Sequence, residues 1–393
     1  MKESRILRVE ALDVFRSITM FLMLFVNDIP GLKEIPHWMF HAEATEDMLG
    51  FSDTIFPGFL FAMGMAVPFA IQNRLAKGDS KRQVVVHILL RSLALVVMGL
   101  FTVNLEKYDG SLGLLSHSWF SILMAVAFFL VWSYYPKTTG RRHSLYVALQ
   151  IAGLLVLLFL FAIYKGEEGA SFAPYWWGIL GLIGWTYLAA AILFLFTKEN
   201  LWLNGLVVLL MLLCSFGSSA GLYKEIPLLQ DFPSWATLYL FGTTGVFASL
   251  LMQKLADREQ PARFMLLMCG IGVVMLVGGL VVHPYWIISK IQATSTWYFF
   301  CCALFFPLFA LIYWLCDVKN QGRWFRLIRP AGTVTLTCYV IPYIWYAVCN
   351  LLGLEYPDFL CAGIPGLLRS VVYSLFIIGI AALLKRAGIR LKI

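Results

Sequence analysis

Long apolar runs recur along almost the whole chain, and they constrain its fold more than any other feature. A helix that crosses a hydrocarbon core of roughly 30 Å needs about 20 predominantly apolar residues. Twelve runs approach this length: 11–29, 52–71, 84–104, 117–135, 144–164, 174–197, 201–222, 235–252, 264–282, 295–316, 332–352 and 362–384. The last run contains Arg369, so eleven spans are an alternative. The pattern predicts an all-α polytopic membrane protein in which residues 1–393 form a single transmembrane domain.

The composition excludes the other common classes of protein. Only 13% of the residues are charged, about half the share found in soluble domains. Aromatic residues make up 16% of the chain, which argues against disorder. The eight cysteines begin only at Cys214, and most lie inside apolar runs, where they read as small hydrophobic residues. No cluster of residues has the spacing of metal ligands, so we expect no metal site.

The distribution of positive charge predicts the orientation in the membrane. The net charge is +8 and the isoelectric point about 9.0. Of the 30 Lys and Arg residues, 22 fall in alternate loops and at the two termini, whereas five fall in the intervening loops, which are acidic. This asymmetry follows the positive-inside rule and predicts that both termini are cytoplasmic. The basic charge is therefore a topology signal, and nucleic acid is not an expected partner. We also expect no cleavable signal sequence, because the first apolar run is too long for one.

The first apolar run contains polar residues that are costly in a bilayer and therefore suggest function. At 100° per residue, Asp13, Arg16 and Asn27 project from one face of the helix. Asp13 and Arg16 are three positions apart and can pair. They form either a structural salt bridge at the inner interface or part of a site. Asn27, at the outer end of the stripe, is the stronger site candidate.

A histidine and an aspartate flank the start of the second run. His41 lies in the predicted outer loop, and Asp53 stands at the head of the run, four residues before Pro57. A proline ring excludes the carbonyl at i−4 from helical hydrogen bonding, so the carbonyl of Asp53 should be free. A carboxylate that holds one imidazole nitrogen leaves the other to act as a general base. The alternative is that His41 is an ordinary residue of the membrane interface, as its neighbour Trp38 suggests.

Four further positions have both a structural and a functional interpretation. Asn104 ends the third run, where asparagine is commonly a helix cap. Arg91 lies slightly inside the inner boundary, where it can reach a phosphate or snorkel to the interface. Lys290 is the only basic residue of its outer loop and is followed by Trp297. Such a pair either anchors the chain in the aromatic belt or binds a sugar.

Other patterns predict packing or exclude familiar chemistry. The small-residue stretches 217–221 and 242–245 predict close helix packing rather than a site. The chain has no nucleotide-binding glycine loop.

Several of these polar positions recur in the order of a known enzyme family. The sequence has Leu12-Asp13-Val14-Phe15-Arg16, then Asn27, His41-Ala42, and Asp53 followed by Phe56-Pro57, Phe59 and Gly64. This order resembles the heparan-α-glucosaminide N-acetyltransferase family, in particular its bacterial branch within the transmembrane acyltransferases. The resemblance covers about residues 5–105 and is weaker over residues 283–340.

The resemblance implies an enzyme that moves an acetyl group from cytoplasmic acetyl-CoA to an amino sugar, such as glucosamine, on the outer side. It assigns the essential histidine to His41 and the paired aspartate to Asp53. Asn27 and Asn104 match asparagines near the site, where Lys290 and Trp297 are further candidates for binding the acceptor. Asp13 and Arg16 match an inner-end motif and, with Arg91, are candidates for binding acetyl-CoA. The family also implies the bacterial inner membrane and a homodimer.

One stretch departs from the family. Animal members carry a further histidine in the penultimate conserved span, whereas the matching segment here places Pro342 there. This leaves His41 as the single well-placed base and makes the acceptor an open question. Two other functions remain open from the residues. A twelve-span secondary transporter of a sugar or related solute has the same topology, and an O-acyltransferase of surface glycans fits the same N-terminal pattern.

Overall fold

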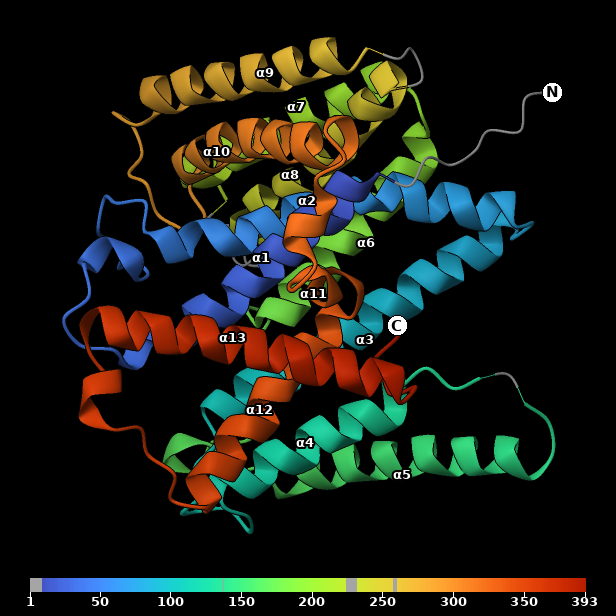
Figure 1. Cartoon of the computed structure of the whole chain (residues 1–393), viewed down its shortest axis with the longest axis vertical. Coiled ribbons are helices and arrows are strands. Elements are labelled where there is room, and N and C mark those ends of the chain that lie inside the picture. Colours follow the sequence, from blue (N-terminus) through green and yellow to red (C-terminus); the bar gives the residue numbers. More distant parts are fainter. Residues whose placement is uncertain (1–8, 137, 224–231, 257–259) are drawn as a thin grey trace. The chain divides into compact units, whose positions relative to one another are not determined.

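Helices make up the regular structure of the part of the chain that can be described. The computed structural model describes residues 9–136, 138–223, 232–256 and 260–393. Over these ranges it has isolated β-bridges but no named strand. The principal helices (Figure 1) are α1 Glu10–Asp28, α2 Phe51–Ala76, α3 Lys81–Glu106, α4 His117–Trp132, α5 Arg141–Ile163, α6 Ile179–Thr197, α7 Leu201–Ser219, α8 Phe232–Ala256, α9 Pro261–Val282, α10 Ser295–Tyr313, α11 Arg329–Thr333, α12 Thr335–Leu351 and α13 Gly363–Arg386.

Each of the twelve apolar runs coincides with a helix, and the prediction of a polytopic all-α protein is confirmed. Nine of the described helices are long and apolar enough to cross a membrane. Helices α4 and α12 are shorter, with 16 and 17 residues. Helix α1 has 19 residues but includes Glu10, Asp13, Arg16 and Asp28. The exact number of spans and the side on which each terminus lies stay predictions. The predicted cytoplasmic residues 1–8 lie outside the described residues.

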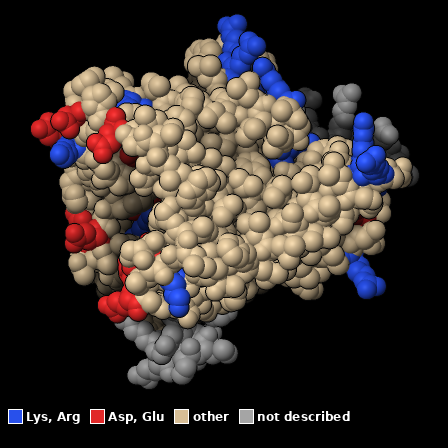
Figure 2. Space-filling model, turned by 90° about the horizontal axis from the view of Figure 1, so that it is seen from below, with Lys and Arg blue, Asp and Glu red and all other residues tan. Residues whose placement is uncertain are grey.

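The surface of the helices is apolar where a soluble protein would be charged. Within α5, Leu154, Leu155 and Leu158 are exposed, and only 17% of its most apolar window is buried. Figure 2 shows one face of the molecule on which a broad uncharged area is flanked by charged groups at the margins. Exposed leucines on such an uncharged surface are stable against lipid rather than water. The chain is therefore an integral membrane protein.

Contacts within the chain gather into two compact units. The first comprises residues 1–30, 34–89 and 185–332, and the second comprises residues 31–33, 90–184 and 333–393. Helices α3 and α6 contribute residues to both. His41, Asp53, Lys290 and Trp297 belong to the first unit, whereas Arg91 and Asn104 belong to the second. That residues 1–393 act as one domain stays a prediction.

Helix α2 is the central element of the first unit and packs closely against α8. A side chain on Gly64 would overlap the backbone of Gly242, and one on Gly245 would overlap the Phe61 carbonyl. The two backbones can approach only because these positions are glycine. The predicted packing role of residues 242–245 is confirmed. This contact holds α2, and with it Asp53, in a fixed position within the unit.

The N-terminal end of α1 is held by a carboxylate from a distant part of the chain. Asp317, in the π-helical turn Trp314–Val318 that continues α10, accepts hydrogen bonds from the Glu10 and Ala11 N–H groups at 2.9 and 2.8 Å. Arg329 pairs with Glu10 at 2.6 Å. A negative group at a helix N-terminus satisfies unpaired donors and complements the helix dipole. The contact therefore fixes the end of α1 that carries Asp13 and Arg16.

Candidate active site

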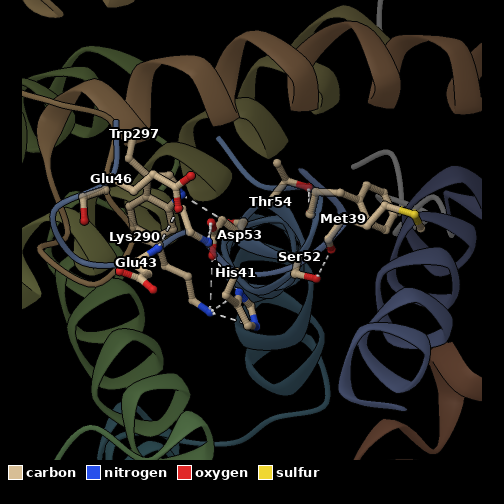
Figure 3. Close-up of polar contacts among 12 residues, drawn as sticks. Met39, His41, Glu43, Glu46, Ser52, Asp53, Thr54, Lys290 and Trp297 are labelled. Carbon is tan, nitrogen blue, oxygen red and sulfur yellow. Dashed lines mark hydrogen bonds and ion pairs between the residues drawn. The ribbon is translucent and has the colours of Figure 1, made fainter. Parts of the chain in front are cut away.

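The backbone carbonyl of Asp53, in the first turn of α2, needs a hydrogen-bond donor from outside the helix. Pro57 has no N–H group to donate to that carbonyl. The missing donor is the Trp297 indole, whose Nε1–H donates to the backbone carbonyl oxygen of Asp53 at 3.1 Å. Trp297 is fully buried at the start of α10. The proline thus creates an acceptor that ties the start of α2 to α10, as Figure 3 shows.

His41 and Asp53 form a hydrogen-bonded pair. His41 Nδ1 lies 2.6 Å from Asp53 Oδ1, and the other carboxylate oxygen accepts the Ala42 N–H at 3.0 Å. The Asp53 side chain is 2% exposed and that of His41 is 41% exposed. The buried carboxylate therefore fixes the ring through Nδ1, while Nε2 stays available for chemistry.

Two small residues fit the histidine loop onto α2, and the sequence reading missed both. Ser52 Oγ donates to the Met39 carbonyl at 2.6 Å. At Gly50, a Cβ atom would overlap the Phe40 carbonyl and crowd the Asp53 carboxylate. Both residues belong to the Gly50-Phe51-Ser52 stretch just before Asp53. Their roles cannot be predicted from that stretch, because they depend on contacts with Met39 and Phe40.

Lys290 joins the pair from the loop between α9 and α10. Its Nζ lies 3.2 Å from His41 Nδ1, 3.5 Å from Nε2 and 3.9 Å from Asp53 Oδ1. The side chain is 25% exposed. Burial lowers the pKa of Lys290, and the opposing charge of Asp53 offsets part of that effect. Figure 3 shows Lys290, His41 and Asp53 converging from three segments of the chain.

A second carboxylate connects the loop of Lys290 to the loop of His41. Asp47 accepts hydrogen bonds from His283 Nε2 at 2.8 Å and from the Ile288 N–H at 2.8 Å. Further hydrogen bonds to the Ala44 carbonyl come from Ser289 Oγ and Gln292 Nε2. Desolvation raises the pKa of Asp47, but the hydrogen bonds from Ile288 and His283 outweigh it, so the pKa is lowered overall. We call these bonds the Asp47 clamp.

Of the other predicted acceptor-side residues, Asn27 and Trp297 belong to the first unit with the pair, and Asn104 belongs to the second. Asn27 lies in the last turn of α1 with an exposed side chain, and among the described residues no hydrogen bond joins it to His41. Asn104 is fully buried in the second unit, where its amide donates to the Leu100 and Ala173 carbonyls and accepts the Ala173 N–H. Trp297 contacts the Asp53 backbone from a buried position. Among the described residues of the first unit, Lys290 is the member of this set that contacts the side chain of His41.

The residues predicted to bind acetyl-CoA lie on two helices. Asp13 and Arg16 are half-buried on α1 in the first unit, and Arg91 is half-buried on α3 in the second. The described residues contain no group of three or more His, Cys, Asp or Glu side chains that could hold a metal ion. The His41 site therefore offers acid–base groups, namely His41, Asp53 and Lys290, that are held by hydrogen bonds.

The fold and site together define a polytopic helical membrane protein with a histidine–aspartate–lysine cluster formed by the start of α2 and two loops of one compact unit. A family model described as "Domain of unknown function (DUF5009)" matches residues 8–244, which is more than half of the chain. The chain belongs to this family.

Two curated proteins are similar to part of the chain. Heparan-alpha-glucosaminide N-acetyltransferase from Homo sapiens is 34% identical over 97 residues, and that from Mus musculus is 32% identical over 97 residues. Each match covers 25% of this chain but only 14% of the relative. The matches agree with the family resemblance seen in the N-terminal motifs.

Proposed function

We propose that this protein is a transmembrane acetyltransferase that moves an acetyl group from acetyl-CoA to the amino group of a glucosamine-like sugar. The observation that carries the proposal is the 2.6 Å contact between the exposed His41 ring and the buried Asp53 carboxylate. The partial similarity to two N-acetyltransferases supports it. A structural histidine at a membrane interface does not need a buried carboxylate with two further contacts, to the Ala42 N–H and to Lys290 Nζ.

Acyl transfer to an amine needs a base and a donor for the oxyanion. His41 Nε2 is the proposed base, or the atom that carries the acetyl group in a covalent intermediate. Asp53 holds the ring in the tautomer that leaves Nε2 unprotonated. Lys290 and the exposed amide of Asn27 are the proposed contacts to the acceptor or the oxyanion. Asn104 instead holds the segment around Ala173 through two amide hydrogen bonds, and it donates a third to the Leu100 carbonyl of its own helix.

The donor would approach from the end of α1 that is predicted to be cytoplasmic. Arg16 of the first unit is the proposed contact for its phosphates, and Asp13 is the proposed partner of Arg16. Arg91, in the second unit, is a separate candidate for the same role. Arg16 and Asn27 are eleven positions apart, which is about 16 Å along a helix. The proposal therefore requires acetyl-CoA to reach from one end of α1 toward the other.

The test uses purified protein in detergent. The thermal midpoint is followed while acetyl-CoA is titrated, and release of free CoA is assayed with and without glucosamine. A ligand that binds only the native state raises its midpoint. We expect stabilisation by acetyl-CoA and release of CoA that depends on glucosamine. Glucose serves as the matched acceptor, because it offers a hydroxyl where glucosamine offers an amine.

Three other outcomes point elsewhere. Absence of both stabilisation and release contradicts acetyl-CoA as donor and favours a transporter, to be tested next with sugars. Equal release with glucose and glucosamine favours an O-acyltransferase. Turnover that survives His41→Ala in a folded protein removes His41 from the mechanism.

A further inference from the structure

We propose that Lys290 is an acetylation site of the protein itself, which accepts the acetyl group when no sugar acceptor is bound. The inference rests on the proposed function, because it needs an acetyl donor at His41. It adds a modification site and a means of regulation to that function.

The position of the amine carries the inference. Lys290 Nζ is a primary amine that lies 3.5 Å from His41 Nε2. In direct transfer and in transfer through an acetyl-histidine, the reacting carbonyl carbon lies beside that nitrogen. The four-carbon stem of lysine is flexible enough to cover a further bond length. Lys290 is therefore close enough to Nε2 to take the place of an acceptor amine when no sugar is bound.

The surroundings of Lys290 favour a reactive amine over an inert ammonium group. Only the neutral amine can attack a carbonyl, and burial lowers the pKa of Lys290. The titratable groups that face it are His41, Asp53 and Cys301, of which Asp53 and Cys301 act in the opposite direction. Glu43 and Glu46 lie in the neighbouring loop (Figure 3). Lys290 thus has a larger neutral fraction than an exposed lysine.

The Asp47 clamp keeps Lys290 in reach. Hydrogen bonds from His283 and Ile288 to Asp47, and from Gln292 to Ala44, fix the loop on both sides of Lys290. Positioning of this kind raises the effective concentration of an attacking group far above that of a free reactant. The juxtaposition with His41 is therefore a property of the fold rather than of one flexible side chain.

The step balances without any further reactant. The nitrogen of Lys290 attacks the acetyl carbon of the thioester, the C–N bond forms and the C–S bond breaks. One amine proton passes to His41 Nε2 and from there to the leaving thiolate, which gives CoA thiol and an acetamide on Lys290. The acetamide is uncharged and stable, and it fills the acceptor position. Donor without acceptor would therefore switch the protein off.

The experiment is peptide mass spectrometry on the whole purified chain. The protein is incubated with acetyl-CoA, with and without glucosamine, and a parallel sample receives 4-nitrophenyl acetate as an acetyl donor unrelated to CoA. Acetyl occupancy is measured at Lys290 and at Lys33 and Lys165, which are exposed lysines of the predicted outer loops. His41→Ala and Lys290→Arg are the variants.

We expect Lys290 to be acetylated at least about tenfold faster than Lys33 and Lys165. Glucosamine should suppress the labelling, His41→Ala should lower it to the rate of the exposed lysines, and residual sugar acetylation should fall as occupancy rises. Equal labelling of all lysines, or labelling of Lys290 that survives His41→Ala, overturns the inference. Turnover of glucosamine by a protein that never labels Lys290 overturns it and leaves the proposed function intact. If neither sugar nor lysine is acetylated by either donor, both proposals fail.

Discussion

Three histidine–carboxylate pairs lie at the start of α2 and in the loops near α2 and α10, and they differ in how far the carboxylate is buried. In His41–Asp53 the carboxylate is 2% exposed, whereas in His37–Glu46 and His283–Asp47 it is 31% and 42% exposed. The distances from nitrogen to oxygen are nearly the same, at 2.6, 2.7 and 2.8 Å. Distance therefore does not separate them.

Burial and additional partners separate the three pairs. Asp53 sits at the start of a buried helix, and its side chain and backbone receive donors from Ala42 and Trp297. Water weakens an exposed ion pair, so such a pair contributes little. A carboxylate excluded from water can orient an imidazole because nothing competes for its oxygens. The exposed pairs connect loops, whereas the buried Asp53 carboxylate fixes the orientation of the His41 imidazole.

The largest contrast is expected between His41 and His37. Replacing His41 with alanine should abolish acetyl transfer, because it removes the proposed base. Replacing His37 with alanine should leave at least about half of the activity, because that pair is exposed and lies outside the site. The measurement is CoA release at saturating acetyl-CoA and glucosamine, with thermal midpoints as a check on folding. Similar losses in both variants would falsify the distinction between the pairs.

The next largest effect is expected for the buried carboxylate. Asp53→Asn should lower the rate by about 10²–10⁴, because the amide favours the wrong imidazole tautomer. Binding of acetyl-CoA should be retained, as measured by the shift in thermal midpoint. The matched change Asp47→Asn should cost much less. Loss of binding in Asp53→Asn would instead assign a structural role to Asp53.

A smaller effect is expected at the indole that supports Asp53. Trp297→Phe keeps most of the ring but leaves the buried Asp53 carbonyl without its donor, at a cost of about 1–3 kcal/mol in stability. The thermal midpoint should fall, and the rate should fall with it if the start of α2 shifts. Trp202→Phe is the control, because Trp202 is 87% exposed. Equal midpoints for the two variants would mean that the indole bond is unimportant.

The smallest effect is expected for the pH dependence of the Asp47 clamp. The folded-state pKa of Asp47 is lowered by its hydrogen bonds, despite desolvation. Its stabilising contribution is therefore fully present above the unfolded value of about 3.8 and is lost as the pH falls through the lower folded value. The measurement is hydrogen exchange in residues 283–294 of wild type and Asp47→Asn between pH 6 and 3. The difference between them should shrink toward low pH, and a constant difference would rule out this carboxylate as the cause.

The sequence by itself determined the membrane class, the positions of the helices and the first half of the candidate site. Apolar length predicts helices in a bilayer because the backbone has no other partner there. The spacing of Asp53 and Pro57 predicted a carbonyl without a helical partner, because the proline effect is local to one turn. The order of His41 and Asp53 identified the pair through its resemblance to known acetyltransferases.

Only the tertiary structure decided which polar residues meet. Lys290 is 249 positions from His41 in the chain, and the Trp297 indole bond to Asp53 spans 244 positions. No local pattern encodes such a distance. The same holds for Asn104, whose buried amide is hydrogen-bonded to the backbone of Ala173. It holds also for Gly50, whose lack of a side chain matters because the Phe40 carbonyl lies against it. Helices form from short-range hydrogen bonds, whereas a site forms from loops that packing brings together.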